Sequence, residues 1–143
     1  AWDFEAKVKQ ILGKLNIHHL QNPVKDLSGG QRKRVALAKT LIDIGFEHKH
    51  TLLMMDEPTN HLDVEMIEWL EHYLNGENIT LLLVTHDRYF LDAVCDEIWE
   101  LERENMYVYK GDYENYMEKK AARLESEQAS IDKARNQYRK ELE

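Results

Sequence analysis

Residues 51–63 have the sequence TLLMMDEPTNHLD, in which an apolar run is followed directly by two acidic residues. Apolar side chains at consecutive positions from Thr51 to Met55 predict a strand of a parallel sheet that is covered on both faces, and Ile79 to Val84 repeats the pattern. The residues from Val64 to Leu74 alternate with a helical period, and another helix is expected near Arg88 to Val94. This order of strand, helix, strand and helix predicts an α/β domain with a parallel-sheet core.

Two adjacent acids, Asp56 and Glu57, follow the first predicted strand. They should lie at the carboxyl edge of the sheet, where ligands bind in folds of this kind. Because successive side chains of a strand point in different directions, Asp56 can face a magnesium ion through its waters while Glu57 faces an attacking water. An Asp-Glu pair without other motifs is more often a solvated helix cap. A catalytic role for the pair therefore depends on the motifs around it.

A third polar cluster, Thr85-His86-Asp87, follows the second predicted strand. If the two strands are neighbours, His86 lies in the same crevice as Asp56 and Glu57 and can hydrogen-bond a terminal phosphate oxygen. The plain alternative is a polar strand-end residue that reaches solvent.

The run LSGGQ at residues 27–31 opens a second predicted helix, which ends at Gly45. Ser28 is its expected N-cap, and the unpaired backbone N–H groups and positive dipole of such a helix start favour a phosphate. The alternative is an ordinary serine cap with a glycine-rich turn. An amphipathic helix is expected earlier, over residues 4–15, with a loop around Pro23 between the two.

The rest of the chain predicts a hairpin and one long helix. Ile98 to Leu101 and Met106 to Tyr109 are the expected strands, with Glu104-Asn105 near their turn. Residues 112–143 contain neither Gly nor Pro and are dense in helix-forming residues, which predicts a helix of about 30 residues, or roughly 45 Å.

An apolar stripe recurs every seven residues along this helix, at Met117, Leu124, Ile131 and Tyr138. The stripe is half of a coiled-coil seam. We favour the first arm of an antiparallel helical hairpin over a solvated helix that leans on the domain.

The composition is 43% hydrophobic and 32% charged, which suits one folded domain with a modest core plus a polar helix. No apolar run approaches the roughly 20 residues that cross a bilayer, and residues 1–5 lack the features of a signal peptide. A cytoplasmic protein without membrane contact is therefore expected. The net charge of -8 argues against a nucleic-acid footprint over the whole surface but is compatible with a local basic patch.

Three motifs in order resemble a known superfamily. LSGGQ, LLMMDEPTNHLD and VTHDRYFLD, at residues 27–31, 52–63 and 84–92, resemble the signature motif, the Walker B motif with D-loop, and the H-switch of an ABC ATPase domain. Within that superfamily, DEPTNHLD and the later YKGDYENY at residues 109–116 resemble the ABC-F proteins, which carry two such domains joined by a charged helical linker. The long helix that follows makes the chain similar to the first domain of the pair.

The resemblance implies a partial ABC ATPase domain of the P-loop NTPase class, with a small helical subdomain, a parallel-sheet core and a long C-terminal helix. Residues 1–50 correspond to the signature-motif helical subdomain, residues 51–111 to the Walker B and H-switch core, and residues 112–143 to the start of the charged interdomain linker.

The roles of the site residues are also implied by this resemblance. Glu57 is expected to be the catalytic carboxylate, His86 the γ-phosphate sensor, and Asp56 the acid that holds Mg²⁺ through water. Asp63 is expected to contact the opposite domain from the D-loop, where His61 is a structural residue. The signature-motif residues are expected to close on the γ-phosphate of ATP bound to the other domain. These residues are Ser28, Gly29, Gly30 and Gln31. The implied partners are the second ABC domain of the same polypeptide, the ribosome and tRNA.

One family feature does not occur in this sequence. No stretch fits G-x-x-x-x-G-K-[ST], since Gly13-Lys14 is followed by Leu15 and has no glycine five positions earlier. We therefore expect the chain to be a partial domain that hydrolyses no appreciable ATP alone. Its sheet should keep an exposed edge, through which the fragment is expected to self-associate.

Two other functions remain open at this point. The nucleotide-binding subunit of an ABC membrane transporter shares every catalytic motif but gives no reason for a long charged helix after the hairpin. A non-catalytic binding or regulatory fragment is the other alternative. A zinc site is disfavoured because the histidines lack ligand spacing with cysteine: His18, His19, His48, His50 and His61.

Overall fold

The computed structural model describes residues 2–18 and 20–143 and divides into two compact units, residues 1–94 and 95–143. Each unit is described by itself. His19 lies outside the described residues. The three-part division at residues 50 and 111 stays a prediction.

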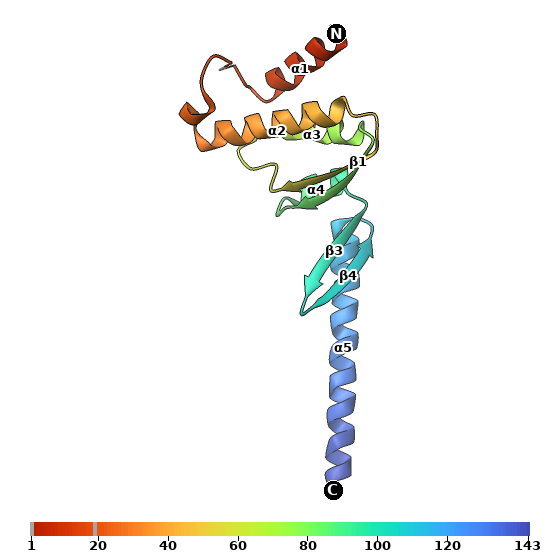
Figure 1. Ribbon diagram of the computed structural model, residues 1–143. Helices are drawn as coiled ribbons and strands as arrows, with labels where there is room; N and C mark the ends of the chain where they lie inside the picture. The colour runs from red at the N-terminus through yellow and green to blue at the C-terminus, as the bar shows by residue number, and fades with distance from the viewer. Residues whose placement is uncertain (1, 19) are drawn as a thin grey trace. The chain divides into compact units, whose positions relative to one another are not determined.

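The first unit alternates helices with two strands (Figure 1). The predicted strands and helices are confirmed, most of them to within one or two residues, and a short 3-10 helix is added to the loop after Pro23. Its elements are α1 (Trp2–Lys14), η1 (Val24–Asp26), α2 (Gly29–Gly45), β1 (Thr51–Asp56), α3 (Val64–Asn75), β2 (Ile79–Val84) and α4 (Arg88–Val94).

Strands β1 and β2 pair in parallel, with a register that runs from Thr51 opposite Ile79 to Asp56 opposite Val84. Leu53 and Met55 of β1 are buried, and the core also contains fully buried side chains from all four helices: Ile11, Leu41, Leu70 and Phe90. Because burial of each such side chain stabilises a fold by about 1.5–3 kcal/mol, this layer holds the first unit together.

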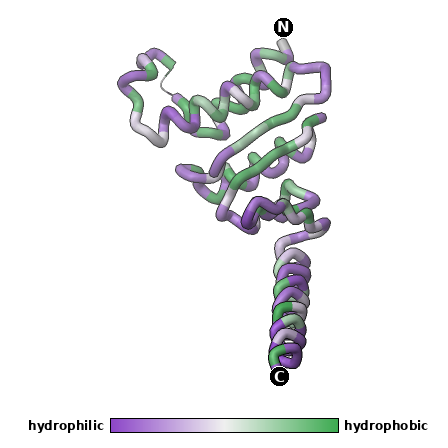
Figure 2. The backbone as a smooth tube through the Cα atoms, turned by 60° about the horizontal axis from the view of Figure 1, so that its bottom comes forward, coloured by the Kyte–Doolittle hydropathy of each residue, from purple (hydrophilic) through white to green (hydrophobic). Residues whose placement is uncertain are grey.

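The other face of β1 and β2 is open to solvent, so the prediction of strands covered on both faces is wrong for this structure. Leu52 and Met54 are 60% and 70% exposed, and Leu82 and Val84 are 42% and 59% exposed. Both strands are hydrophobic along their length in Figure 2. The run of consecutive apolar residues was read correctly, but no described element packs on this face.

Polar contacts join three helices at the end of α2. The Lys7 ammonium of α1 donates to the Gly45 carbonyl oxygen and to Glu77, at 3.2 Å each. The Tyr73 hydroxyl of α3 donates to the Leu41 carbonyl oxygen at 2.7 Å. Burial and the nearby Glu77 carboxylate raise the pKa of Tyr73 to about 12, so the hydroxyl stays a donor at neutral pH.

The second unit consists of the antiparallel strands β3 (Glu97–Glu102) and β4 (Asn105–Lys110) and the long helix α5 (Tyr113–Leu142). The turn between the strands lies at Arg103 and Glu104, close to the predicted Glu104-Asn105. Arg103 and Glu104 both have positive φ, 48° and 67°, whereas Asn105 already pairs with Glu102. Two positive φ values fit a two-residue hairpin turn, whose twist matches that of the strands.

Helix α5 begins at the N-cap Asp112, whose side chain accepts from the Asn115 N–H at 2.9 Å. Its anchor is a cluster around Glu100 of β3. The Arg123 guanidinium donates to Glu100 at 2.7 Å and to the Tyr109 hydroxyl at 2.8 Å, and Lys120 pairs with Glu100 at 2.8 Å. Arg123 also lies over the Tyr107 ring, 3.8 Å from its centroid, so charge and stacking both fix the helix on the hairpin.

The heptad stripe of α5 is exposed along the helix, at Met117, Leu124, Ile131 and Tyr138. The reading of this helix as one arm of a helical hairpin stays a prediction. Among the described residues, no helix is long and apolar enough to cross a membrane.

Candidate functional site

The geometry of the predicted site starts from the register of the two parallel strands. Because Asp56 lies opposite Val84, the next residues, Glu57 and Thr85, also lie side by side. The Glu57 backbone N–H donates to the Val84 carbonyl oxygen at 2.7 Å, which extends the pairing by one residue. The His86 Nε2 atom then lies 3.6 Å from a Glu57 carboxylate oxygen. The structure thus places His86 beside Glu57, as neighbouring strands require.

Glu57 and His86 differ in their exposure. The Glu57 side chain is 23% exposed, and that of His86 is fully exposed. The Glu57 backbone has φ of 48°, in the left-handed region that non-glycine residues rarely occupy. This conformation turns the chain out of the strand at the carboxylate. A half-buried carboxylate beside an open imidazole suits a base with a phosphate-binding partner.

Thr85 contacts Glu57, a role that the sequence motif does not indicate. Its hydroxyl lies 3.4 Å from the second Glu57 carboxylate oxygen and accepts from the Asp87 backbone N–H at 2.9 Å. Thr85 therefore orients the Glu57 carboxylate from the neighbouring strand. The parallel register was the signal that could have found this contact.

Asp56 is exposed at the end of β1. Its hard oxygen donors fit Mg²⁺, which commonly takes one or two protein carboxylates and completes its shell with water and phosphate. Among the described residues, no group of three or more His, Cys, Asp or Glu side chains is arranged to hold a metal ion. A single carboxylate fits a metal that arrives with its nucleotide.

The start of α2 shows how the signature residues are held. The Ser28 hydroxyl accepts from the Gln31 backbone N–H at 3.1 Å, and the Gln31 side chain accepts from the Ser28 N–H at 2.9 Å. This reciprocal capping box is the ordinary serine cap considered from the sequence. The N–H groups of Gly29 and Gly30 have no acceptor among the described residues, so they remain able to donate to an anion.

The described side chains of the signature turn make no direct polar contact with the carboxylate pair. Among the described residues, no hydrogen bond or ion pair joins Ser28 or Gln31 to Glu57 or His86. Asp63 caps α3, accepting from the Met66 N–H at 2.9 Å. The lack of a direct polar contact between these described side chains is compatible with signature residues that serve a second nucleotide site.

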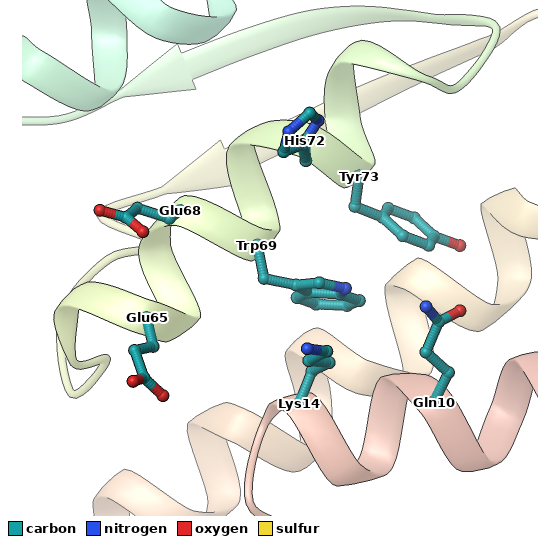
Figure 3. Close-up of a pocket in the computed structure, with 7 residues that line it drawn as sticks. All are labelled: Gln10, Lys14, Glu65, Glu68, Trp69, His72 and Tyr73. Atoms are coloured by element: carbon teal, nitrogen blue, oxygen red, sulfur yellow. The ribbon is translucent and has the colours of Figure 1, made fainter.

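A hollow of about 710 Å³ lies between α1 and α3 in the first unit. Trp69 and Tyr73 project from α3 toward Gln10 and Lys14 of α1 (Figure 3). It contains none of the predicted site residues. Glu65 and Glu68 also line it, and their carboxylates would repel phosphate, so we do not place the nucleotide there.

Comparison with known proteins gives a consistent family. Residues 3–60 and 99–143 each match a family profile described as ABC transporter. The chain is 49% identical over 142 residues to the uncharacterized ABC transporter ATP-binding protein YfmR of Bacillus subtilis, covering 99% of this chain and 22% of that protein. It is also 49% identical over 124 residues to the energy-dependent translational throttle protein EttA of Mycobacterium tuberculosis, covering 87% of this chain and 21% of that protein.

The chain belongs to the ABC-F family. A third relative, the ATP-binding protein ChvD of Rhizobium radiobacter, is 43% identical over 88% of this chain and 42% of its own length. The first relatives named here are matched over about a fifth of their lengths. Among solved structures, CbiO1 of Clostridium perfringens, part of the ABC transporter complex CbiONQ, has a TM-score of 0.50 at 30% identity and covers 84% of this chain and 48% of that one.

These matches confirm the fold class of this ABC-F chain, an α/β partial ABC ATPase domain with a parallel-sheet core and a long C-terminal helix. The roles of Glu57, His86, Asp56 and Asp63, and of residues 28–31, stay predictions.

Proposed function

We propose that this chain is the C-terminal part of the first ABC domain of an ABC-F ATPase, followed by the start of the linker to a second ABC domain in the same polypeptide. The observation that carries the proposal is the pair Glu57 and His86, which stands at the ends of neighbouring parallel strands with side chains 3.6 Å apart. In this proposal residues 1–50 are helical subdomain, residues 51–111 are catalytic core and residues 112–143 are linker.

The substrate is ATP with Mg²⁺. Glu57 orients an attacking water and accepts its proton as the water's oxygen bonds to the γ-phosphorus and the bond to the β-γ bridging oxygen breaks. His86 hydrogen-bonds a γ-phosphate oxygen. Asp56 holds the Mg²⁺ through water. The contact of Thr85 with Glu57 supports this assignment, because a general base must hold one orientation.

The start of α2 acts on the ATP of the second domain. The free N–H groups of Gly29 and Gly30 and the positive end of the helix approach its γ-phosphate, with Ser28 and Gln31 beside them. Asp63 contacts the opposite domain from the D-loop. Because residues 1–143 contain no phosphate-binding loop motif, the chain alone hydrolyses no appreciable ATP, and its open sheet favours self-association.

The process served is translation, in the cytoplasm, with the ribosome and tRNA as partners. The 49% identity to a protein named energy-dependent translational throttle supports this reading. So does helix α5, which fits a linker between two domains.

The test uses the full-length protein, with Glu57→Gln combined with the matching change in its second domain. The change keeps the size of the side chain and removes the base, so ATP turnover should fall by about 100-fold or more while ATP still binds. The double variant should therefore sediment with ribosomes when ATP is present, and the wild type should do so less.

The exposed Glu65→Gln of α3 is a matched control that should keep wild-type turnover. If Glu57→Gln keeps its turnover, the assignment of the base is wrong. If no variant binds ribosomes in any nucleotide state, the proposed role in translation is wrong. The result would then favour the alternative, the nucleotide-binding subunit of an ABC membrane transporter.

A further inference from the structure

A close approach joins the predicted signature turn to the loop that carries Glu57. A methyl group placed on the Gly30 Cα would lie 3.3 Å from His61 Nδ1 and 3.5 Å from its Cγ atom. At the preceding position, Gly29, no described residue outside the first turns of α2 lies within 4 Å of such a methyl group. The His61 ring therefore lies close to the α2 backbone at Gly30, and a methyl group there would make a tight contact that displaces the ring slightly.

His61 is held by a short loop of two consecutive turns. The Asn60 N–H donates to the Glu57 carbonyl oxygen at 3.3 Å, and the Leu62 N–H donates to the Thr59 carbonyl oxygen at 3.2 Å. Thr59 is buried, and His61 has φ of 66°. A residue in the left-handed conformation inside a turn has little freedom to adopt another backbone conformation. The loop therefore restricts the position of the His61 ring.

Helix α2 is also held on its buried side. Leu41 is fully buried and Ala38 is 2% exposed. One turn after Gly30, the Nε atom of Arg34 is shielded from solvent. Because closely packed helices resist displacement and His61 is exposed, we expect a methyl group at Gly30 to displace the ring more than the helix.

We propose that His61 is a positioning residue that supports the signature turn at Gly30 and couples it to Glu57, four residues earlier in the same loop. The proposal rests on the proposed function. If residues 28–31 serve the ATP of the second domain while Glu57 serves the ATP of this one, the His61 contact links the two nucleotide sites inside one domain.

The first experiment measures the contact. In the full-length protein with selectively labelled histidine, the His61 ring resonances should move in Gly30→Ala and stay in place in Gly29→Ala. Both substitutions replace glycine by alanine in the first turn of the same helix, so a general effect on the helix would appear in both. If the chemical shifts of the His61 ring do not change in Gly30→Ala, the inference is wrong.

The second experiment measures the coupling through ATP turnover. His61→Ala should lower kcat about tenfold, since small displacements of positioned groups cost that much, and should leave KM for ATP within about twofold. His61→Asn should recover most of the loss, because asparagine keeps a planar polar side chain and tolerates positive φ. Equal losses in the two variants, or a loss confined to KM, contradict a positioning role.

The third measurement is suppression. Gly30→Ala should lower kcat because its methyl displaces the ring, and Gly30→Ala combined with His61→Asn should regain part of it because asparagine is smaller. A double variant no better than Gly30→Ala overturns the coupling. If the full-length wild type hydrolyses no ATP, the proposed function itself fails, and the ring resonances alone then decide whether His61 supports Gly30.

Discussion

Replacing Ser28 separates the cap of α2 from the predicted phosphate contact. Ser28→Ala removes the hydroxyl that accepts from the Gln31 N–H at 3.1 Å and leaves the reciprocal bond from the Ser28 N–H in place. Loss of a serine cap costs about 1 kcal/mol. In a unit of residues 1–94, this corresponds to a fall in Tm of about 4–8 °C.

Ser28→Asp is the informative partner of this variant. Aspartate caps helices as well as serine does, and its charge suits the positive helix end, so the Tm should stay within about 2 °C of wild type. In the full-length protein, the same charge would face the γ-phosphate of ATP. A like-charge contact near 4 Å costs up to about 4 kcal/mol, so turnover should fall at least about tenfold.

The assays are thermal unfolding of residues 1–143 and steady-state ATP hydrolysis by the full-length protein, with the same substitutions in both. Ser28→Ala should lose stability, whereas Ser28→Asp should lose turnover with its stability kept. If Ser28→Asp keeps wild-type turnover, Ser28 does not contact the γ-phosphate of ATP. An aspartate variant that unfolds as early as the alanine variant would show that the cap is not what the side chain contributes.

Two further predictions concern stability. Tyr73→Phe removes the 2.7 Å hydrogen bond to the Leu41 carbonyl oxygen and should lower the free energy of unfolding by about 1 kcal/mol in urea, whereas Tyr138→Phe, on an exposed ring, should have no effect. Hydrogen bonds from Lys120 and Tyr116 hold the pKa of Glu100 below its usual range, so this carboxylate stabilises the fold above its unfolded pKa, near 4.5, and the contribution is lost as the pH falls through the lower folded pKa. Tm measured against pH should therefore drop more steeply on the acid side in wild type than in Glu100→Gln, and identical slopes would contradict the assignment.

The elements of the fold were predictable because each has a distinct local signal. Strand β2 has the predicted bounds, Ile79–Val84, and β1 runs one residue past the predicted Thr51 to Met55. The exact position of the hairpin turn was not predictable, because Asn105 tolerates positive φ better than Arg103 or Glu104, and residue preference alone favours it. Register decided otherwise, and register depends on both strands together.

The candidate site was only partly predictable. The sequence shows that Glu57 and His86 each follow a predicted strand. Parallel pairing of the two strands then places the two side chains close together. The contacts of Thr85 with Glu57 and of His61 with Gly30 depend on side-chain directions across loops, for which the sequence carries no periodic signal. Whether the second face of the sheet is covered could not be predicted either. An apolar run predicts that a strand is buried but does not show which element covers it.

The anchor of α5 has a consequence for how this helix forms. An isolated helix pays for its first turn before it gains hydrogen bonds, and in water a stretch of about 15 residues is marginal by itself. Here the turns that contain Lys120 and Arg123 are tied to β3 and β4 through Glu100 and Tyr109. They supply the nucleus, and the exposed turns beyond Glu127 need only propagate from it. Backbone amides should therefore exchange with solvent faster with distance from the hairpin, and the length of ordered helix depends on contacts made near its beginning.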